Sequence, residues 1–168
     1  PALRDKRGVR YWAYPGMAGY EHGNMGLERD VEKGTISTNP ENHELMVRAR
    51  QAKIAQIADS IPALQLINAQ QNKDVLLVGW GSTEGHLHAA ANELGCALAQ
   101  FNYICPLPRN TREVLSQYKR IIVCELNTGQ FATYLRAQFP EITFEQYNEI
   151  QGQPFAIERI VNFVMNND

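Results

Sequence analysis

Residues 74–83 read DVLLVGWGST, an apolar run that ends in a glycine-rich turn. The VLLV run at residues 75–78 leaves no polar face. It therefore predicts a buried strand with helices on both sides, as in the parallel sheets of α/β proteins. Gly79 and Gly81 favour a tight turn into a following helix, whose first backbone N–H groups form a candidate anion site.

The same alternation of strand and helix continues to the end of the chain. Further strands are expected at residues 97–105, 120–125 and 142–147, the last of them at a sheet edge. Helices are expected to start at Ser82 or Thr83, at Asn110, at residues 127–130 and at Pro154. This order, with right-handed crossovers, predicts a three-layer α/β/α domain with a mainly parallel sheet.

Residues 1–39 differ from the rest of the chain because no hydrophobic period holds in them. They contain Tyr11, Trp12, Tyr14 and Tyr20 among many glycines. Irregular segments of this length are uncommon unless they are functional or packed on another body, so we expect a surface that is covered in an assembly. Asn39 as N-cap and Pro40 as first helical residue begin a helix. The predicted division is an irregular arm or linker at 1–39 and an α/β domain at 40–168.

Composition limits the function classes. The 168 residues suffice for one domain, and 16 Lys and Arg against 18 Asp and Glu, with no basic run among aromatics, argue against a nucleic-acid partner. Cys96, Cys105 and Cys124 lack zinc or iron–sulfur spacing and are expected to be reduced core thiols. With no apolar run of about 18 residues and no signal-peptide pattern, we expect a soluble, cytoplasmic protein without a membrane partner.

The glycine turn allows three interpretations. Its G-x-G-x-x-x-G spacing, from Gly79 to Gly85, is one residue longer than the dinucleotide fingerprint, and no acidic residue closes a following strand. A purely structural strand-to-helix turn is favoured over an anion or substrate tail near Ser82 and Thr83, and both are favoured over a dinucleotide. No P-loop motif is present.

Polar side chains follow the strand at residues 120–125. Glu125, Asn127 and Gln130 stand at the carboxyl edge where open α/β sheets bind ligands, but a helix cap built on Glu125 is the preferred interpretation. His86 and His88 are two apart on a helix, which is poor geometry for one metal. His22 and His43 are expected at a surface or interface. The residues indicate no catalytic set and no metal site.

Several segments together resemble one known family. They are YPGMAGYEHGNMGLERD, NPENHELMVRARQAKIAQIA, VLLVGWGSTEGHLHAA, PLPRNTREVL, VCELNTGQFATYLRAQF and YNEIQGQPF. In order and spacing they resemble the C-terminal region of the alpha subunit of 2-oxoacid:ferredoxin oxidoreductases, most closely the 2-oxoglutarate type. The resemblance implies a domain similar to the C-terminal domain of transketolase, with a mostly parallel five-stranded sheet between helices. The extra strand is expected at residues 63–68, running against the others.

The resemblance also implies a function for the whole enzyme. Such enzymes oxidatively decarboxylate a 2-oxoacid with thiamine diphosphate and magnesium, pass electrons through iron–sulfur clusters to ferredoxin, and release an acyl-coenzyme A. The family's diphosphate motif, G-D-G followed by N-N, and its cluster cysteines are absent from this chain. We therefore expect no cofactor and no catalytic residue on this chain, which would be inactive alone.

The expected role is contact with the upstream alpha-subunit domain and the beta subunit, with ferredoxin reached through the complex. The candidate ligand-binding or partner-facing residues are Gly79, Gly81, Ser82, Thr83, Glu125, Asn127 and Gln130. The alternative is a self-standing α/β protein that binds a small ligand or phosphate at the strand ends near Gly81 and Glu125.

Overall fold

The computed structural model describes residues 4–23, 26–69 and 72–166, and its contacts divide the chain into two compact units. The units are Pro1–Ser60 and Ile61–Asp168. The helix that begins at Pro40 is grouped with the arm, whereas the sequence pattern predicts it as part of the α/β domain. The boundary at residues 39 and 40 stays a prediction about domains. In the described part of the chain no helix has the length and apolar character needed to cross a membrane.

The first unit contains the helix α1, Pro40–Ile57, and irregular segments. The Asn39 side chain accepts the N–H of Asn42 at 2.7 Å, which confirms the predicted cap. Asn42 itself is buried and holds the arm on the helix: its amide accepts from the Val31 N–H at 2.9 Å and donates to the Arg29 carbonyl at 3.0 Å. Residues 4–23 and 26–39 contain no helix, and their strand-like pairing is limited to isolated bridges, so the irregular arm is confirmed.

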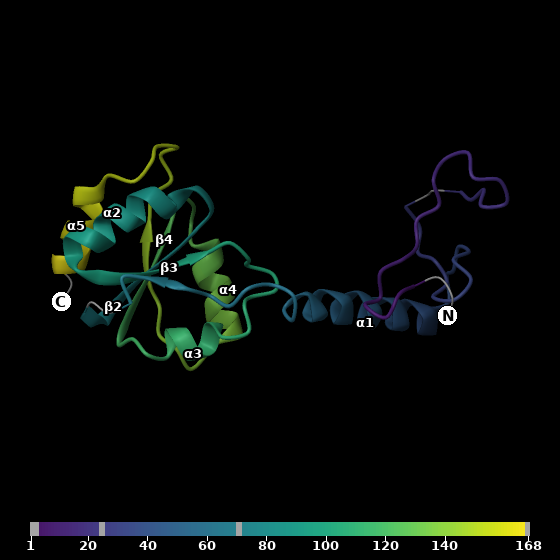
Figure 1. The fold of residues 1–168 in the computed structure, drawn as a ribbon, viewed down its shortest axis with the longest axis horizontal. Coiled ribbons are helices and arrows are strands. Elements are labelled where there is room, and N and C mark those ends of the chain that lie inside the picture. Colours follow the sequence, from purple (N-terminus) through teal and green to yellow (C-terminus); the bar gives the residue numbers. More distant parts are fainter. Residues whose placement is uncertain (1–3, 24–25, 70–71, 167–168) are drawn as a thin grey trace. The chain divides into compact units, whose positions relative to one another are not determined.

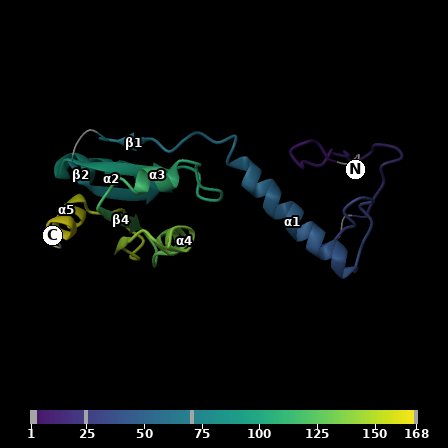
Figure 2. The same ribbon diagram turned by 90° about the horizontal axis from the view of Figure 1, so that it is seen from below.

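The second unit is built on one sheet, ordered β1-β3-β2-β4-β5 in the described residues. Its strands are β1 Leu66–Ile67, β2 Asn72–Trp80, β3 Cys96–Phe101, β4 Arg120–Glu125 and β5 Glu145–Asn148. The pairs β2–β3, β2–β4 and β4–β5 are parallel, whereas β1 runs antiparallel to β3. Figure 2 shows β1 along one margin of this unit and β4 toward the other. The mostly parallel sheet, the opposed strand near residues 63–68 and the edge position of β5 are all confirmed.

Helices cover both faces of the sheet, as Figure 1 shows. The helix α2, Glu84–Leu94, follows the short 3-10 turn η1, Gly81–Thr83, and lies on one face with α5, Ile157–Asn166. The opposite face carries α3, Thr111–Leu115, and α4, Gln130–Gln138. Alternate residues of β2 serve the two cores, with Leu77 on the α2 side and Leu76 on the α4 side. The three-layer α/β/α prediction is confirmed.

Some local predictions were wrong. The strand expected at 97–105 ends at Phe101, and Cys105 is exposed rather than part of the core. Thr83 does not cap α2 with its side chain; its hydroxyl donates to the Trp80 carbonyl at 2.8 Å. Asn110 precedes α3 but bonds the backbone of Leu64 instead, accepting its N–H at 2.8 Å and donating to its carbonyl at 3.0 Å. In both cases the side chain bonds a backbone group of a turn or of another segment instead of the helix end.

Candidate functional site at the carboxyl end of the sheet

The two turns singled out in the sequence meet at the carboxyl end of the sheet. They follow β2 and β4, which are parallel neighbours with Val78 opposite Val123. The indole N–H of Trp80 donates to Oε1 of Glu125 at 3.3 Å and links one turn to the other. The structure thus brings residues 79–83 and 125–130 to a single edge, the position at which open α/β sheets bind ligands.

Glu125 is fully buried, and its carboxylate is used within the chain. Oε1 accepts the backbone N–H of Phe131 at 2.8 Å and the amide of Asn127 at 3.0 Å, besides the Trp80 indole. Oε2 accepts the N–H of Ala132 at 3.0 Å. The backbone N–H groups of Phe131 and Ala132 belong to the first turn of α4, where a helix offers unpaired donors and the positive end of its dipole. Glu125 therefore occupies the anion position of α4 itself.

Asn127 and Gly129 complete the start of α4. Oδ1 of Asn127 accepts the N–H groups of Gly129 at 2.8 Å and Gln130 at 3.0 Å. Gly129 has φ 95°, a left-handed backbone angle that favours glycine, and a Cβ on it would lie 2.0 Å from Nε2 of Gln146 unless that side chain moved. The helix-cap interpretation of Glu125 is confirmed, and Gln130 remains exposed beside it.

The turn after β2 also has a structural explanation. A Cβ on Gly79 would lie 2.1 Å from Cδ1 of Leu87, so this glycine lets α2 pack directly on the strand. Gly81 has φ 61°, and its carbonyl accepts the Gln100 amide at 3.0 Å. Thr83 is buried, whereas Gly81 and Ser82 are exposed. No described contact identifies a ligand at this turn, so a ligand-binding role for these residues stays a prediction.

An aromatic pocket lies beside the two turns, with a volume of about 280 Å³. Its lining consists of Trp80, Ile104, Cys105, Gln130, Phe131 and Tyr134. Burial raises the pKa of the Tyr134 hydroxyl, and the neighbouring Cys105 raises it further. Of these lining residues, only Gln130 is among the candidates predicted from the sequence. The spacing of Phe131 and Tyr134 was the available signal, since residues three apart share a helix face.

The Glu125 carboxylate accepts four hydrogen bonds from within the chain. The aromatic pocket beside it is lined mainly by apolar atoms. Within residues 4–23, 26–69 and 72–166, no three His, Cys, Asp or Glu side chains are grouped to hold a metal.

Two histidines of the first unit have nearby partners. His43 Nδ1 lies 2.5 Å from Oε2 of Glu28, and His22 Nδ1 lies 2.8 Å from the Tyr20 carbonyl. Both are surface pairs, as expected for these histidines.

Comparison with known proteins gives the relatives of this chain. No family model matches it. Over 98% of its length the chain is 37% identical to the 2-oxoglutarate oxidoreductase subunit KorA of Mycobacterium tuberculosis. The chain is similar to one part of that subunit. It spans only 26% of the length of KorA.

A solved structure agrees with this result. The chain superposes with a TM-score of 0.83 and 29% identity on a 2-oxoglutarate:ferredoxin oxidoreductase from Magnetococcus marinus, solved with 2-oxoglutarate, coenzyme A and succinyl-CoA bound. The match covers 96% of this chain and 29% of the Magnetococcus chain. The resemblance stated from the sequence segments is confirmed, and so is the fold class that it implied.

Proposed function

We propose that this chain is the C-terminal structural and subunit-interaction domain of the alpha subunit of a cytoplasmic 2-oxoglutarate:ferredoxin oxidoreductase. The observation that carries the proposal is the unequal coverage of the match: 98% of this chain aligns with KorA, but only 26% of KorA is spanned. The whole enzyme would convert 2-oxoglutarate and coenzyme A to an acyl-coenzyme A and carbon dioxide, and would reduce ferredoxin. Its further partners are the upstream alpha-subunit domain and the beta subunit.

The residues of this chain do not fit the cofactors of such an enzyme. The magnesium ion of thiamine diphosphate requires several oxygen ligands, and no suitable carboxylate group occurs among the described residues. Iron–sulfur clusters require several cysteine thiolates, whereas Cys96 and Cys124 are buried and Cys105 is exposed. We therefore assign thiamine diphosphate, magnesium and the clusters to other parts of the enzyme, and coenzyme A to its substrates.

Exposed aromatic side chains support an interaction role. Tyr14 and Tyr20 are 66% and 62% exposed within the first unit. Burial of such apolar surface stabilises a complex by about 25 cal/mol for each Å² removed from water, so contact with a partner protein is favoured. In the second unit, Gly81, Ser82 and Gln130 are the exposed members of the candidate set and are proposed to face partner domains.

The alternative, a self-standing protein that binds a phosphate at Gly81 and Glu125, is less well supported. The Glu125 carboxylate already occupies the N-terminus of α4 and would repel a second anion. The N-terminus of α2 carries Glu84 in its first turn, which also disfavours an anion.

The test is to identify the native polypeptide and its activity. Antibodies against this chain should detect a polypeptide much longer than 19.0 kDa in source extracts, and the captured complex should reduce a viologen dye with 2-oxoglutarate and coenzyme A. The recombinant 168-residue chain should show no turnover with 2-oxoglutarate, coenzyme A and added thiamine diphosphate. A native polypeptide of 19 kDa without this activity, or turnover by the chain alone, would overturn the proposal.

A further inference from the structure

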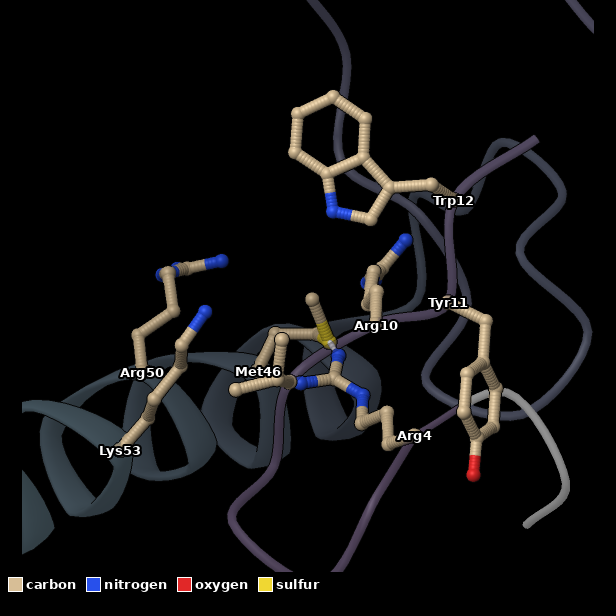
Figure 3. Close-up of a pocket in the computed structure, with 8 residues that line it drawn as sticks. Arg4, Arg10, Tyr11, Trp12, Met46, Arg50 and Lys53 are labelled. Carbon is tan, nitrogen blue, oxygen red and sulfur yellow. Dashed lines mark hydrogen bonds between the residues drawn. The ribbon is translucent and has the colours of Figure 1, made fainter. Parts of the chain in front are cut away.

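The first unit contains a hollow with an unusual concentration of positive charge. This basic pocket has a volume of about 590 Å³. Its lining consists of Arg4, Val9, Arg10, Tyr11, Trp12, Met46, Arg50 and Lys53, with no carboxylate among them. Figure 3 shows Arg50 and Lys53 projecting from α1 on one side and Arg4, Arg10 and Trp12 on the other.

A small loop in the arm holds two of the cations together. Arg4 and Arg10 face each other in an antiparallel bridge. The Asp5 carboxylate accepts the N–H groups of Arg7 and Val9, both at 2.9 Å, and so fixes the loop between them. Because Asp5 is occupied with this loop, it is not the counter-ion of the pocket.

The helix supplies the other cations from a single face. Met46, Arg50 and Lys53 follow one another at intervals of four and three residues in α1, so their side chains lie on one stripe. Met46 is buried and forms the apolar floor, with the Arg4 guanidinium 3.7 Å from its sulfur. The pocket therefore has an apolar base and a charged rim.

The positive charges are only partly balanced. Arg50 pairs with Oε1 of Glu28 at 3.2 Å, but the described residues provide no ion pair for Arg10 or Lys53. Burial lowers the pKa of Arg4, and the charge of Arg10 lowers it further because two like charges repel each other. An anion in the pocket would remove this repulsion and would receive charge-assisted hydrogen bonds.

Trp12 adds a planar surface above the cations. Its indole is 79% exposed and lies above Arg10 at the mouth of the pocket (Figure 3). We propose that the basic pocket binds the phosphate groups of a nucleotide-type ligand, with the indole of Trp12 stacking on the base. This inference goes beyond the proposed function, which assigns no ligand to this chain.

The shape of the surface favours a small molecule over an acidic protein. The cations surround a hollow whose volume lies within the roughly 300–1,000 Å³ of known ligand sites. Coenzyme A and free adenine nucleotides share the required chemistry, because both combine phosphates with a purine ring. An acidic protein surface would need the cations on a broad face rather than around a cavity.

The test is titration calorimetry of the 168-residue chain with coenzyme A, ADP and inorganic pyrophosphate in parallel. The expected result is saturable binding of a nucleotide at one site. Preference for coenzyme A over ADP would indicate the former as the source, and equal affinities would indicate nucleotides in general. Arg10→Gln and Lys53→Gln should each weaken binding by about tenfold or more, because each removes a phosphate contact. Lys6→Gln, an exposed cation of the same unit outside the pocket lining, is the matched control.

The Trp12→Ala variant separates the contribution of base stacking to binding from the contribution of the positive charges. It should weaken binding of both nucleotides but leave pyrophosphate unchanged. Circular dichroism should give each variant the same helix content as the natural chain. Absence of nucleotide binding would overturn the proposal, as would tighter binding of pyrophosphate or of a poly-glutamate peptide. Neither result would affect the proposed oxidoreductase role, which depends on the native polypeptide and its activity.

Discussion

The indole N–H of Trp80 donates to Oε1 of Glu125 across 3.3 Å and joins the ends of two neighbouring parallel strands. Glu125 at the same time receives the first N–H groups of α4. One buried carboxylate therefore connects β2, β4 and α4. The arrangement explains why an acidic residue can be fully buried at a strand end, since its negative charge lies at the positive end of a helix dipole.

The first prediction concerns this carboxylate. Glu125→Gln should lower the free energy of unfolding by about 2–4 kcal/mol, because an amide nitrogen would face a buried N–H that needs an acceptor. Urea unfolding followed by circular dichroism measures the change. Glu141→Gln, which removes the exposed partner of Arg112, should change it by at most about 0.5 kcal/mol. Equal urea midpoints for the two variants would show that Glu125 contributes no more to stability than an exposed carboxylate does.

The second prediction concerns two glycines of opposite character. Gly79→Ala should destabilise the chain by about 1–3 kcal/mol, since its Cβ would lie 2.1 Å from Leu87. Gly85→Ala should stabilise it by up to about 1 kcal/mol, because Gly85 is an exposed residue of α2 with nothing within 4 Å of the added carbon. Thermal unfolding of both variants checks the signs. A stabilising Gly79→Ala would contradict the close packing of α2 on β2.

The third prediction concerns thiol reactivity. In the folded chain at pH 8, one of the three cysteines should react quickly with a disulfide reagent, and it should be Cys105. Cys96 and Cys124 are buried, and burial raises the pKa of both thiols, so little reactive thiolate is present. Spectrophotometric counting should give one fast thiol in buffer and three in denaturant. Loss of the fast phase in Cys105→Ser identifies the residue, and a fast phase that survives this substitution would contradict the assignment.

The fourth prediction concerns alkaline pH. Burial raises the pKa of Cys96 from 9.0 to about 11, so the folded state keeps a proton that the unfolded state loses. The associated stability is fully present below pH 9 and is lost as the pH rises from 9 to about 11. Unfolding free energies measured across this range should decline less steeply in Cys96→Ala than in the natural chain. Identical slopes would show that Cys96 does not contribute.

Local patterns predicted most of the architecture. The VLLV run in β2 requires burial on both sides, and the Asn39–Pro40 pair is a helix start that depends only on neighbouring backbone groups. The opposed strand near β1 came from the resemblance, because two residues, Leu66 and Ile67, carry too little pattern to be recognised alone. The predicted strand at 97–105 extended past Phe101, since sequence pattern does not show where neighbouring strands stop pairing.

The sequence by itself determined the α/β class, the order of its elements and the relationship to 2-oxoglutarate oxidoreductase subunits, because these depend on periodicity and on segment order. Only the tertiary structure decided how side chains are used. It added the Trp80 indole to the donors around Glu125, left Cys105 exposed, and gathered Arg4 and Arg10 with Arg50 and Lys53 of α1. The physical reason is that burial, hydrogen bonding and charge proximity depend on distances in space, and residues far apart in the chain set those distances.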